Sequence, residues 1–187
     1  MSIDLKQLVL RLSHTPPRCI HSAWPRALRS LSQILDDAGS IIFTSWAVSA
    51  LPDLNQCKVV GEPTLVTSEP PASLLFGPLA LVSQNHTVEL FNPVIHGFNN
   101  EIDVIDSKIT KPVPDAELLS RRRPFECEQC GVTLFSVSVS IYYQRGTVDL
   151  LLKYPDLPTP DMFNAINIYG ICAACGQQNV IAEADGL

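Results

Sequence analysis

The sequence predicts an α+β protein in which N-terminal helices and a mixed or antiparallel β region precede a C-terminal antiparallel module with a metal site. Apolar residues recur at helical spacing in the first 38 residues. From Ile41 to about Ile109, short runs of Val, Ile, Leu and Phe alternate with Pro, Gly, Asn and Ser, which is typical of strands joined by turns. The last third contains paired cysteines and an alternating apolar segment. We therefore expect an α+β region over residues 1–114 and a second module over residues 115–187.

Two helices are expected near the N-terminus. Residues 4–12 form the first, and the two prolines after Thr15 end it because proline removes a backbone donor and clashes with the preceding turn. The second and clearer helix begins at an N-cap on Ser22 and stops at Gly39. Its apolar face consists of Trp24, Ala27, Leu28, Leu31, Ile34, Leu35 and Ala38.

The middle of the chain is expected to form strands. The four candidate runs are residues 41–44, 63–67, 79–82 and 87–91. Periodicity does not distinguish a strand from a helix in runs this short, so helical alternatives stay open for residues 45–50 and 72–76. Prolines at 112 and 114 predict a linker, and a short helix is expected over residues 115–122.

Four cysteines carry the strongest functional signal in the sequence. They form two Cys-x-x-Cys-Gly motifs, a spacing that lets two thiolates reach one ion while backbone N–H groups point at the sulfur atoms. The glycine after each pair is expected to take a positive φ that closes the turn. Four thiolates make a closed tetrahedral site for zinc. The predicted ligands of one structural zinc ion (Zn2+) are Cys127, Cys130, Cys172 and Cys175.

These motifs resemble those of zinc-ribbon modules. The resemblance rests on the four cysteines, on Gly131 and Gly176, and on the strands expected after each motif, and it covers about the last 60 residues. The 41 residues between Cys130 and Cys172 exceed the roughly 15–20 of the compact pattern, so the hairpin is enlarged. Residues 1–120 resemble no named family.

The sequence of the enlarged hairpin also predicts secondary structure. Apolar residues alternate with serine and tyrosine over residues 135–143, which predicts a half-buried strand. The elements expected after it are a turn at 144–146, a strand at 148–153, a proline-rich loop at 156–160, and strands at 165–169 and 179–182. Together they predict a small antiparallel sheet with the metal at one end.

Three other interpretations of the four cysteines stay open. The same paired motifs hold iron in rubredoxin-like electron carriers. Four thiols also allow a redox-active dithiol pair. A catalytic zinc is the third, although such sites normally keep a position free for water or substrate, which four cysteines do not.

Composition and charge indicate which partners and which cellular location the protein is expected to have. A net charge of −6 gives no general attraction to nucleic acid or to an anionic membrane. No apolar run reaches the roughly 18–20 residues that span a bilayer, and no signal-peptide pattern is visible. Paired cysteines favour a reducing compartment, so we expect a cytoplasmic location. Residues 36–120 contain eleven acidic and three basic residues, which suits a basic protein partner.

The leading hypothesis is a non-enzymatic zinc-containing protein that binds another protein, as an adaptor, an inhibitor or a toxin-neutralising protein. No catalytic residue is assigned. An enzyme with a site near His96, assisted by Glu101 or Asp103, is one alternative. Cys19 and Cys57 lie outside any motif and are expected to be buried as small apolar side chains.

A nucleic-acid-binding protein is the other alternative. It rests on the zinc-ribbon resemblance and on the basic cluster Arg121, Arg122 and Arg123, which could contact phosphates. The aromatic residues of the alternating segment could stack on bases. They are Phe135, Tyr142 and Tyr143.

Overall fold

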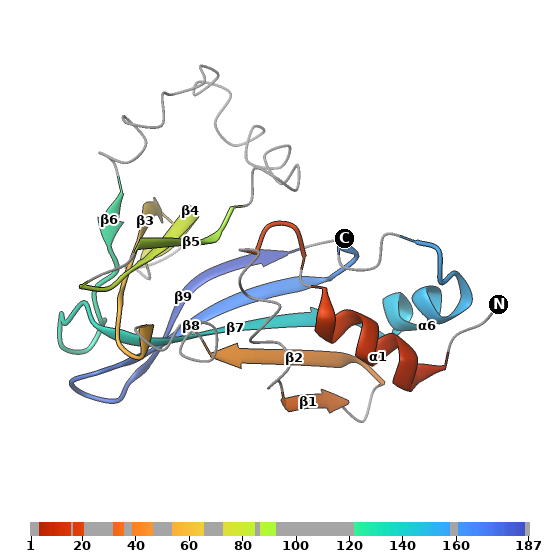
Figure 1. The fold of residues 1–187 in the computed structure, drawn as a ribbon. Helices are drawn as coiled ribbons and strands as arrows, with labels where there is room; N and C mark the ends of the chain where they lie inside the picture. Colours follow the sequence, from red (N-terminus) through yellow and green to blue (C-terminus); the bar gives the residue numbers. More distant parts are fainter. Residues whose placement is uncertain are drawn as a thin grey trace, which may run out of the picture.

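The computed structural model describes nine separate stretches of the chain. They are residues 4–15, 17–20, 32–35, 39–46, 54–65, 73–84, 87–92, 122–157 and 161–185. The helices and strands within them, drawn in Figure 1, are α1 (Leu5–His14), β1 (Ser32–Leu35), β2 (Ile41–Trp46), β3 (Lys58–Leu65), β4 (Ser73–Val82), β5 (Thr87–Phe91), β6 (Arg123–Pro124), β7 (Phe135–Tyr143), α6 (Arg145–Lys153), β8 (Ala165–Cys172) and β9 (Gln178–Asp185).

The strands form two antiparallel sheets, in agreement with the α+β class. The larger sheet has the order β1-β2-β7-β8-β9 and the smaller one has the order β5-β4-β3-β6. Each sheet combines strands from both sides of residue 114. The expected linker at 111–114 and most of the expected helix at 115–122 lie outside the described residues.

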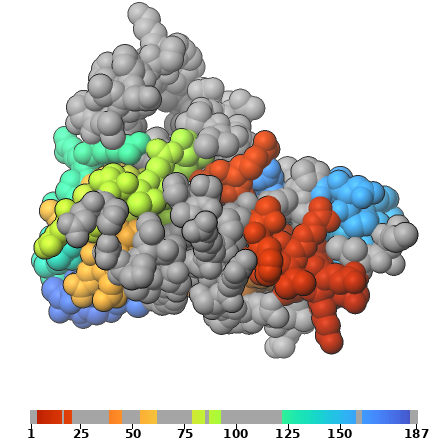
Figure 2. Space-filling model, viewed as in Figure 1, coloured from red at the N-terminus to blue at the C-terminus, as the bar shows by residue number. Residues whose placement is uncertain are grey.

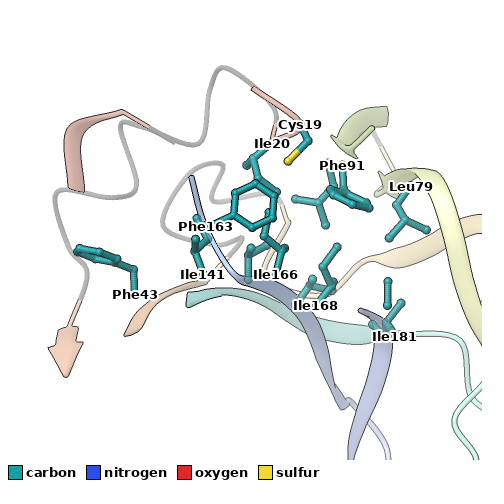
Figure 3. Packing of buried hydrophobic residues seen from close by; sticks show 14 of the residues in the cluster. Cys19, Ile20, Phe43, Leu79, Phe91, Ile141, Phe163, Ile166, Ile168 and Ile181 are labelled. Carbon is teal, nitrogen blue, oxygen red and sulfur yellow. The ribbon is translucent and has the colours of Figure 1, made fainter. Parts of the chain in front are cut away.

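Apolar side chains from both sheets share one core. β9 passes close to β4, and an isolated bridge joins Cys57 to Phe135 between the sheets. Figure 3 shows side chains of the smaller sheet and of the chain near Ile20 facing those of the larger sheet. The labelled members of this cluster are Cys19, Ile20, Phe43, Leu79, Phe91, Ile141, Phe163, Ile166, Ile168 and Ile181.

The N-terminal helix is confirmed and extends two residues beyond the prediction. Asp4 is its N-cap, because its side chain accepts a hydrogen bond of 2.8 Å from the backbone N–H of Gln7. Its buried face consists of Leu8 and Leu12. The Arg11 guanidinium donates to backbone carbonyls just after α6, and Figure 2 shows the red N-terminal helix at the same end of the molecule as α6.

The helix predicted between Ser22 and Gly39 is wrong at residues 32–35. These residues form β1, which pairs with residues 41–44 of β2 at the edge of the larger sheet. Gly39 has a φ of +82°, so it serves the turn between two strands and does not stop a helix. Tertiary pairing therefore overrides the local helical pattern here. Residues 21–31 and 36–38 lie outside the described part of the chain.

The expected turn at 144–146 and the expected strand at 148–153 are also wrong, because α6 begins at Arg145, with Gln144 as its N-cap, and continues to Lys153. Val148 and Leu151 are buried while Asp149 and Leu150 are exposed, which is a three-residue spacing and not an alternation. The helical alternative for residues 72–76 is excluded over residues 73–76, which belong to β4. Of the alternative at 45–50, residues 45 and 46 belong to β2 and the rest is not described.

Candidate metal centre

Two loops bring the four cysteines to one end of the larger sheet, opposite the two helices (Figure 1). We call residues 127–131 the first knuckle and residues 172–176 the second knuckle. The first lies between β6 and β7, and the second joins β8 to β9. Because β7 and β8 pair directly, with Phe135 opposite Cys172, both knuckles project from the same end of the larger sheet.

A backbone hydrogen bond ties the chain at the first knuckle to the smaller sheet, and ring packing ties it to the larger sheet. The N–H of Phe125 donates to the carbonyl of Val59 in β3 at 2.8 Å. Within the loop, the N–H of Cys127 donates to Val132 at 2.9 Å, and the N–H of Gly131 donates back to Cys127 at 2.8 Å. The Phe125 ring packs edge-on against Phe135, with centroids 5.5 Å apart. The loop is therefore held in place by the polypeptide itself.

The second knuckle repeats the same pattern. The N–H of Cys172 donates to Gln177 at 2.9 Å, and the N–H of Gly176 donates back to Cys172 at 3.0 Å. Gly131 and Gly176 have φ angles of +71° and +73°, the left-handed conformation predicted from the motif. Two loops of matching geometry thus face each other across the end of the sheet.

The geometry of the four sulfur atoms fits a tetrahedral metal ion. All four Sγ atoms lie within 4.8 Å of one another. Two contacts join the two knuckles: Cys127 to Cys175 at 3.6 Å and Cys130 to Cys172 at 3.5 Å. Sulfur atoms bound to zinc at about 2.3 Å in a tetrahedron lie about 3.8 Å apart. The cluster, which we call the four-cysteine site, can therefore hold a metal ion with little rearrangement.

Hydrogen bonds to the sulfur of the first cysteine in each knuckle stabilise a negative charge on that sulfur. Backbone N–H groups two and three residues further along the chain donate to this sulfur. Burial raises the pKa of Cys127, but these bonds and the neighbouring thiols lower it to about 6. In the second knuckle, the N–H of Cys175 is the main cause that lowers the pKa of Cys172.

The second cysteine of each knuckle shows the opposite shift. The N–H of Val132 lowers the pKa of Cys130, but burial and the neighbouring thiols outweigh it and raise the pKa to about 12. The N–H of Gln177 lowers the pKa of Cys175, but burial and the thiols of Cys127 and Cys172 outweigh it, so the pKa is raised. Four sulfur atoms this close favour a mixture of thiols and thiolates, and a divalent cation among them would favour four thiolates.

Asn179 is a residue of the site that the sequence analysis missed. Its side chain is buried, with 3% exposed, beside the sulfur of Cys127. The sequence places Asn179 in the strand after the second knuckle, and an asparagine there carries no signal for contact with the first knuckle. The contact arises because the two knuckles meet.

The structure does not favour base stacking by the aromatic residues of β7. Phe135 and Tyr143 are 0% and 1% exposed, so neither ring is open to a ligand. The hydroxyl of Tyr142 donates to Ser40 at 3.1 Å. The stacking alternative is therefore excluded for these two rings, which belong to the core.

The basic cluster lies only partly within the described residues. Arg122 is nearly buried, with its side chain 10% exposed and its guanidinium 3.9 Å from the carboxylate of Glu89. Arg123 is exposed in β6. Arg121 is not described, and neither are His96, Glu101 and Asp103.

Cys19 and Cys57 are buried in the apolar core, as predicted, and are not members of the four-cysteine site. Burial raises the pKa of each thiol to about 12. Both therefore remain neutral thiols at physiological pH. Within the described residues, the cysteines divide into two buried core residues and four members of the candidate metal centre.

No family model, no curated protein and no solved structure matches the chain. The site is therefore interpreted from its own geometry. In the part of the chain that the structure describes, no helix has both the length and the apolar character needed to cross a membrane.

Proposed function

We propose that the four-cysteine site binds one structural zinc ion in a zinc-ribbon-like module. The observation that carries this proposal is the convergence of four Sγ atoms within 4.8 Å of one another from two matching knuckles. Zinc suits four thiolates in a tetrahedron and needs no redox partner. Cys127, Cys130, Cys172 and Cys175 would be its ligands, and the ion would neutralise their charge and link the two loops.

The arrangement of secondary structure supports a structural role for the ion. The first knuckle follows β6 of the smaller sheet, and the second knuckle joins β8 to β9 of the larger sheet. One ion bound to both knuckles would therefore fasten the two sheets to each other. A site closed by four protein ligands leaves no coordination position for a substrate, which favours structure over catalysis.

We further propose that the protein is non-enzymatic and acts by binding another protein in the cytoplasm, as an adaptor, an inhibitor or a toxin-neutralising protein. Its charge supports this proposal, because residues 36–120 carry eleven acidic and three basic residues. A basic partner would be attracted to such a segment. The nucleic-acid alternative is weakened by the buried rings of β7 and by the ion pair of Arg122 with Glu89.

Metal analysis of the purified protein tests the zinc site. We expect one zinc per chain in the wild-type protein and loss of zinc in Cys127→Ser and Cys172→Ser. Cys19→Ala and Cys57→Ala are matched controls, because they remove buried cysteines outside the site, and both should retain one zinc. Iron in place of zinc would support the electron-carrier interpretation. Absence of any bound metal would exclude the proposal.

Affinity purification from the native host under mild conditions tests the protein-binding role. We expect one basic protein at a fixed stoichiometry, released by raising the salt concentration because the attraction is between charges. The partner should bind again when both purified proteins are mixed at low salt. Recovery of nucleic acid, or turnover of a substrate by the pure protein without any partner, would contradict the proposed role.

A further inference from the structure

The side-chain amide of Asn179 connects the two knuckles through three hydrogen bonds. The backbone N–H of Glu128, in the first knuckle, donates to its Oδ1 at 3.1 Å. Its Nδ2 donates to the Sγ of Cys127 at 3.7 Å and to the carbonyl of Gln177 at 3.0 Å. Gln177 directly follows the second knuckle, so one buried amide contacts the first knuckle and the chain at the end of the second.

The orientation of this amide follows from its partners. The oxygen must face the N–H of Glu128, because that group can only donate. The nitrogen must then face the sulfur of Cys127 and the carbonyl of Gln177, which both accept. All three partners agree with a single orientation, so the amide cannot turn over without losing them.

Asn179 belongs to the strand that follows the second knuckle, but the sulfur that it contacts belongs to the first knuckle. It thus fixes the distance between the knuckles independently of the metal. The carbonyl of Gln177 also accepts the N–H of Cys172 at 2.9 Å, so the same network reaches a cysteine of each loop. Groups of this kind around a metal orient the ligands and reduce the cost of assembling the site.

We propose that Asn179 is a positioning residue of the metal centre. It holds the two knuckles at the spacing of a single ion, and its N–H bond to Cys127 withdraws negative charge from that sulfur when the sulfur binds the metal. This inference rests on the proposed zinc site. It assigns a residue outside both Cys-x-x-Cys-Gly motifs to metal binding.

The Asn179→Asp variant tests the proposal with almost no change of shape. Aspartate keeps an oxygen that accepts from Glu128, but when ionised it has no N–H to donate to Cys127 or Gln177. Asn179→Ala removes all three bonds, and Gln178→Ala is the matched control because Gln178 is the exposed neighbour. Zinc affinity is measured by competition with a chromophoric chelator. The absorption spectrum of the cobalt(II)-loaded protein is the second readout.

We expect zinc affinity to fall by about 10- to 100-fold in both Asn179 variants and to stay unchanged in Gln178→Ala. The sulfur-to-cobalt charge-transfer band should move to longer wavelength, because a sulfur that loses a hydrogen bond holds its electrons less tightly. A purely structural role would lower stability without moving this band, and that result would overturn the proposal.

The two proposals fail in different ways. A wild-type protein that binds neither zinc nor cobalt overturns the metal site, and this inference with it. A wild-type protein that binds zinc, with Asn179 variants that match it in affinity and spectrum, overturns the role of Asn179 alone. If Asn179→Asp does not fold, Asn179→Ala supplies the same two readouts.

Discussion

At the scale of single residues, Gly170 in β8 occupies a position where one methyl group has no room. A Cβ atom there would lie 2.6 Å from Cδ1 of Ile181 and 3.0 Å from the ring of Phe135. Both neighbours are fully buried, so neither can move away freely. We expect Gly170→Ala to reduce the free energy of unfolding by about 1–3 kcal/mol, measured by urea denaturation of the metal-loaded protein.

Gly146→Ala is the control for this prediction. It adds the same methyl group in α6, where a Cβ atom would meet nothing within 4 Å. Alanine favours a helix over glycine, so this variant should be unchanged or more stable by up to about 1 kcal/mol. Equal destabilisation by the two substitutions would show that crowding at Gly170 is not the cause.

The buried thiols of Cys19 and Cys57 predict a loss of stability at alkaline pH. Burial raises the pKa of each from 9.0 to about 12 in the folded protein. Their contribution to stability is therefore complete below pH 9 and is lost as the pH rises toward 12. The free energy of unfolding should fall above pH 9 by up to about 1.4 kcal/mol per pH unit for each thiol.

Cys57→Ala measures how much one buried thiol contributes to this loss of stability at alkaline pH. The variant and the wild-type protein are unfolded with urea at several values between about pH 8 and pH 11, and the slopes of stability against pH are compared. The slope of the variant should be shallower. The buried phenol of Tyr143, whose pKa burial also raises, adds to the slope in both proteins and cancels in the comparison. Identical slopes would contradict the prediction.

At the scale of elements, a clear local periodicity predicted one element correctly and another wrongly. The alternation over residues 135–143 gave β7 with its observed bounds. The sequence did not predict α6, because so short a run of apolar residues does not distinguish a helix from a strand. β1 was missed because the antiparallel pairing of Ser32–Leu35 with β2 is a tertiary interaction that no local window contains.

In the candidate site too, the residues of the local motifs could be predicted from the sequence, and the residue brought in by a tertiary contact could not. The four cysteines and the positive φ of both glycines follow from local chemistry, and the structure confirms that the sulfur atoms converge. Asn179 contacts Cys127 only because the loops meet, and it lies 52 positions further along the chain. Sequence spacing therefore identifies the potential ligands but not the residues that position them.

Substitutions at Gly131 test whether the backbone conformation of the first knuckle is needed for metal binding. The φ of +71° at Gly131 is strained for residues with a Cβ atom, yet a Cβ atom there would meet nothing within 4 Å. Gly131→Val should therefore weaken zinc binding through backbone strain alone, by about 1–2 kcal/mol, or roughly tenfold. Gly131→Asn should have a smaller effect, because asparagine tolerates this conformation. Chelator competition measures both, and equal losses would exclude backbone strain as the cause.

At the scale of the whole molecule, the two sheets are joined in two different ways. One is the shared core, in which residues such as Leu79 and Phe91 pack with Ile168 and Ile181. The other is the end of the molecule where the knuckles meet. A continuous apolar core does not depend on a metal ion, whereas the loops that carry the cysteines bury little apolar surface. The loss of ordered structure on metal removal should therefore be confined to the knuckles.

Removal of the proposed zinc ion by a chelator tests this division. We expect faster hydrogen exchange at the amides of Cys172 and Gly176 in the second knuckle, while pairs in the middle of the sheet, such as Val139 with Ile168, stay protected. Overall stability should fall by the binding free energy of the ion, about 4 kcal/mol when free zinc exceeds its dissociation constant a thousandfold. Complete unfolding on chelation would instead show that the ion is needed by the whole core, because then no part of the larger sheet would keep its protection.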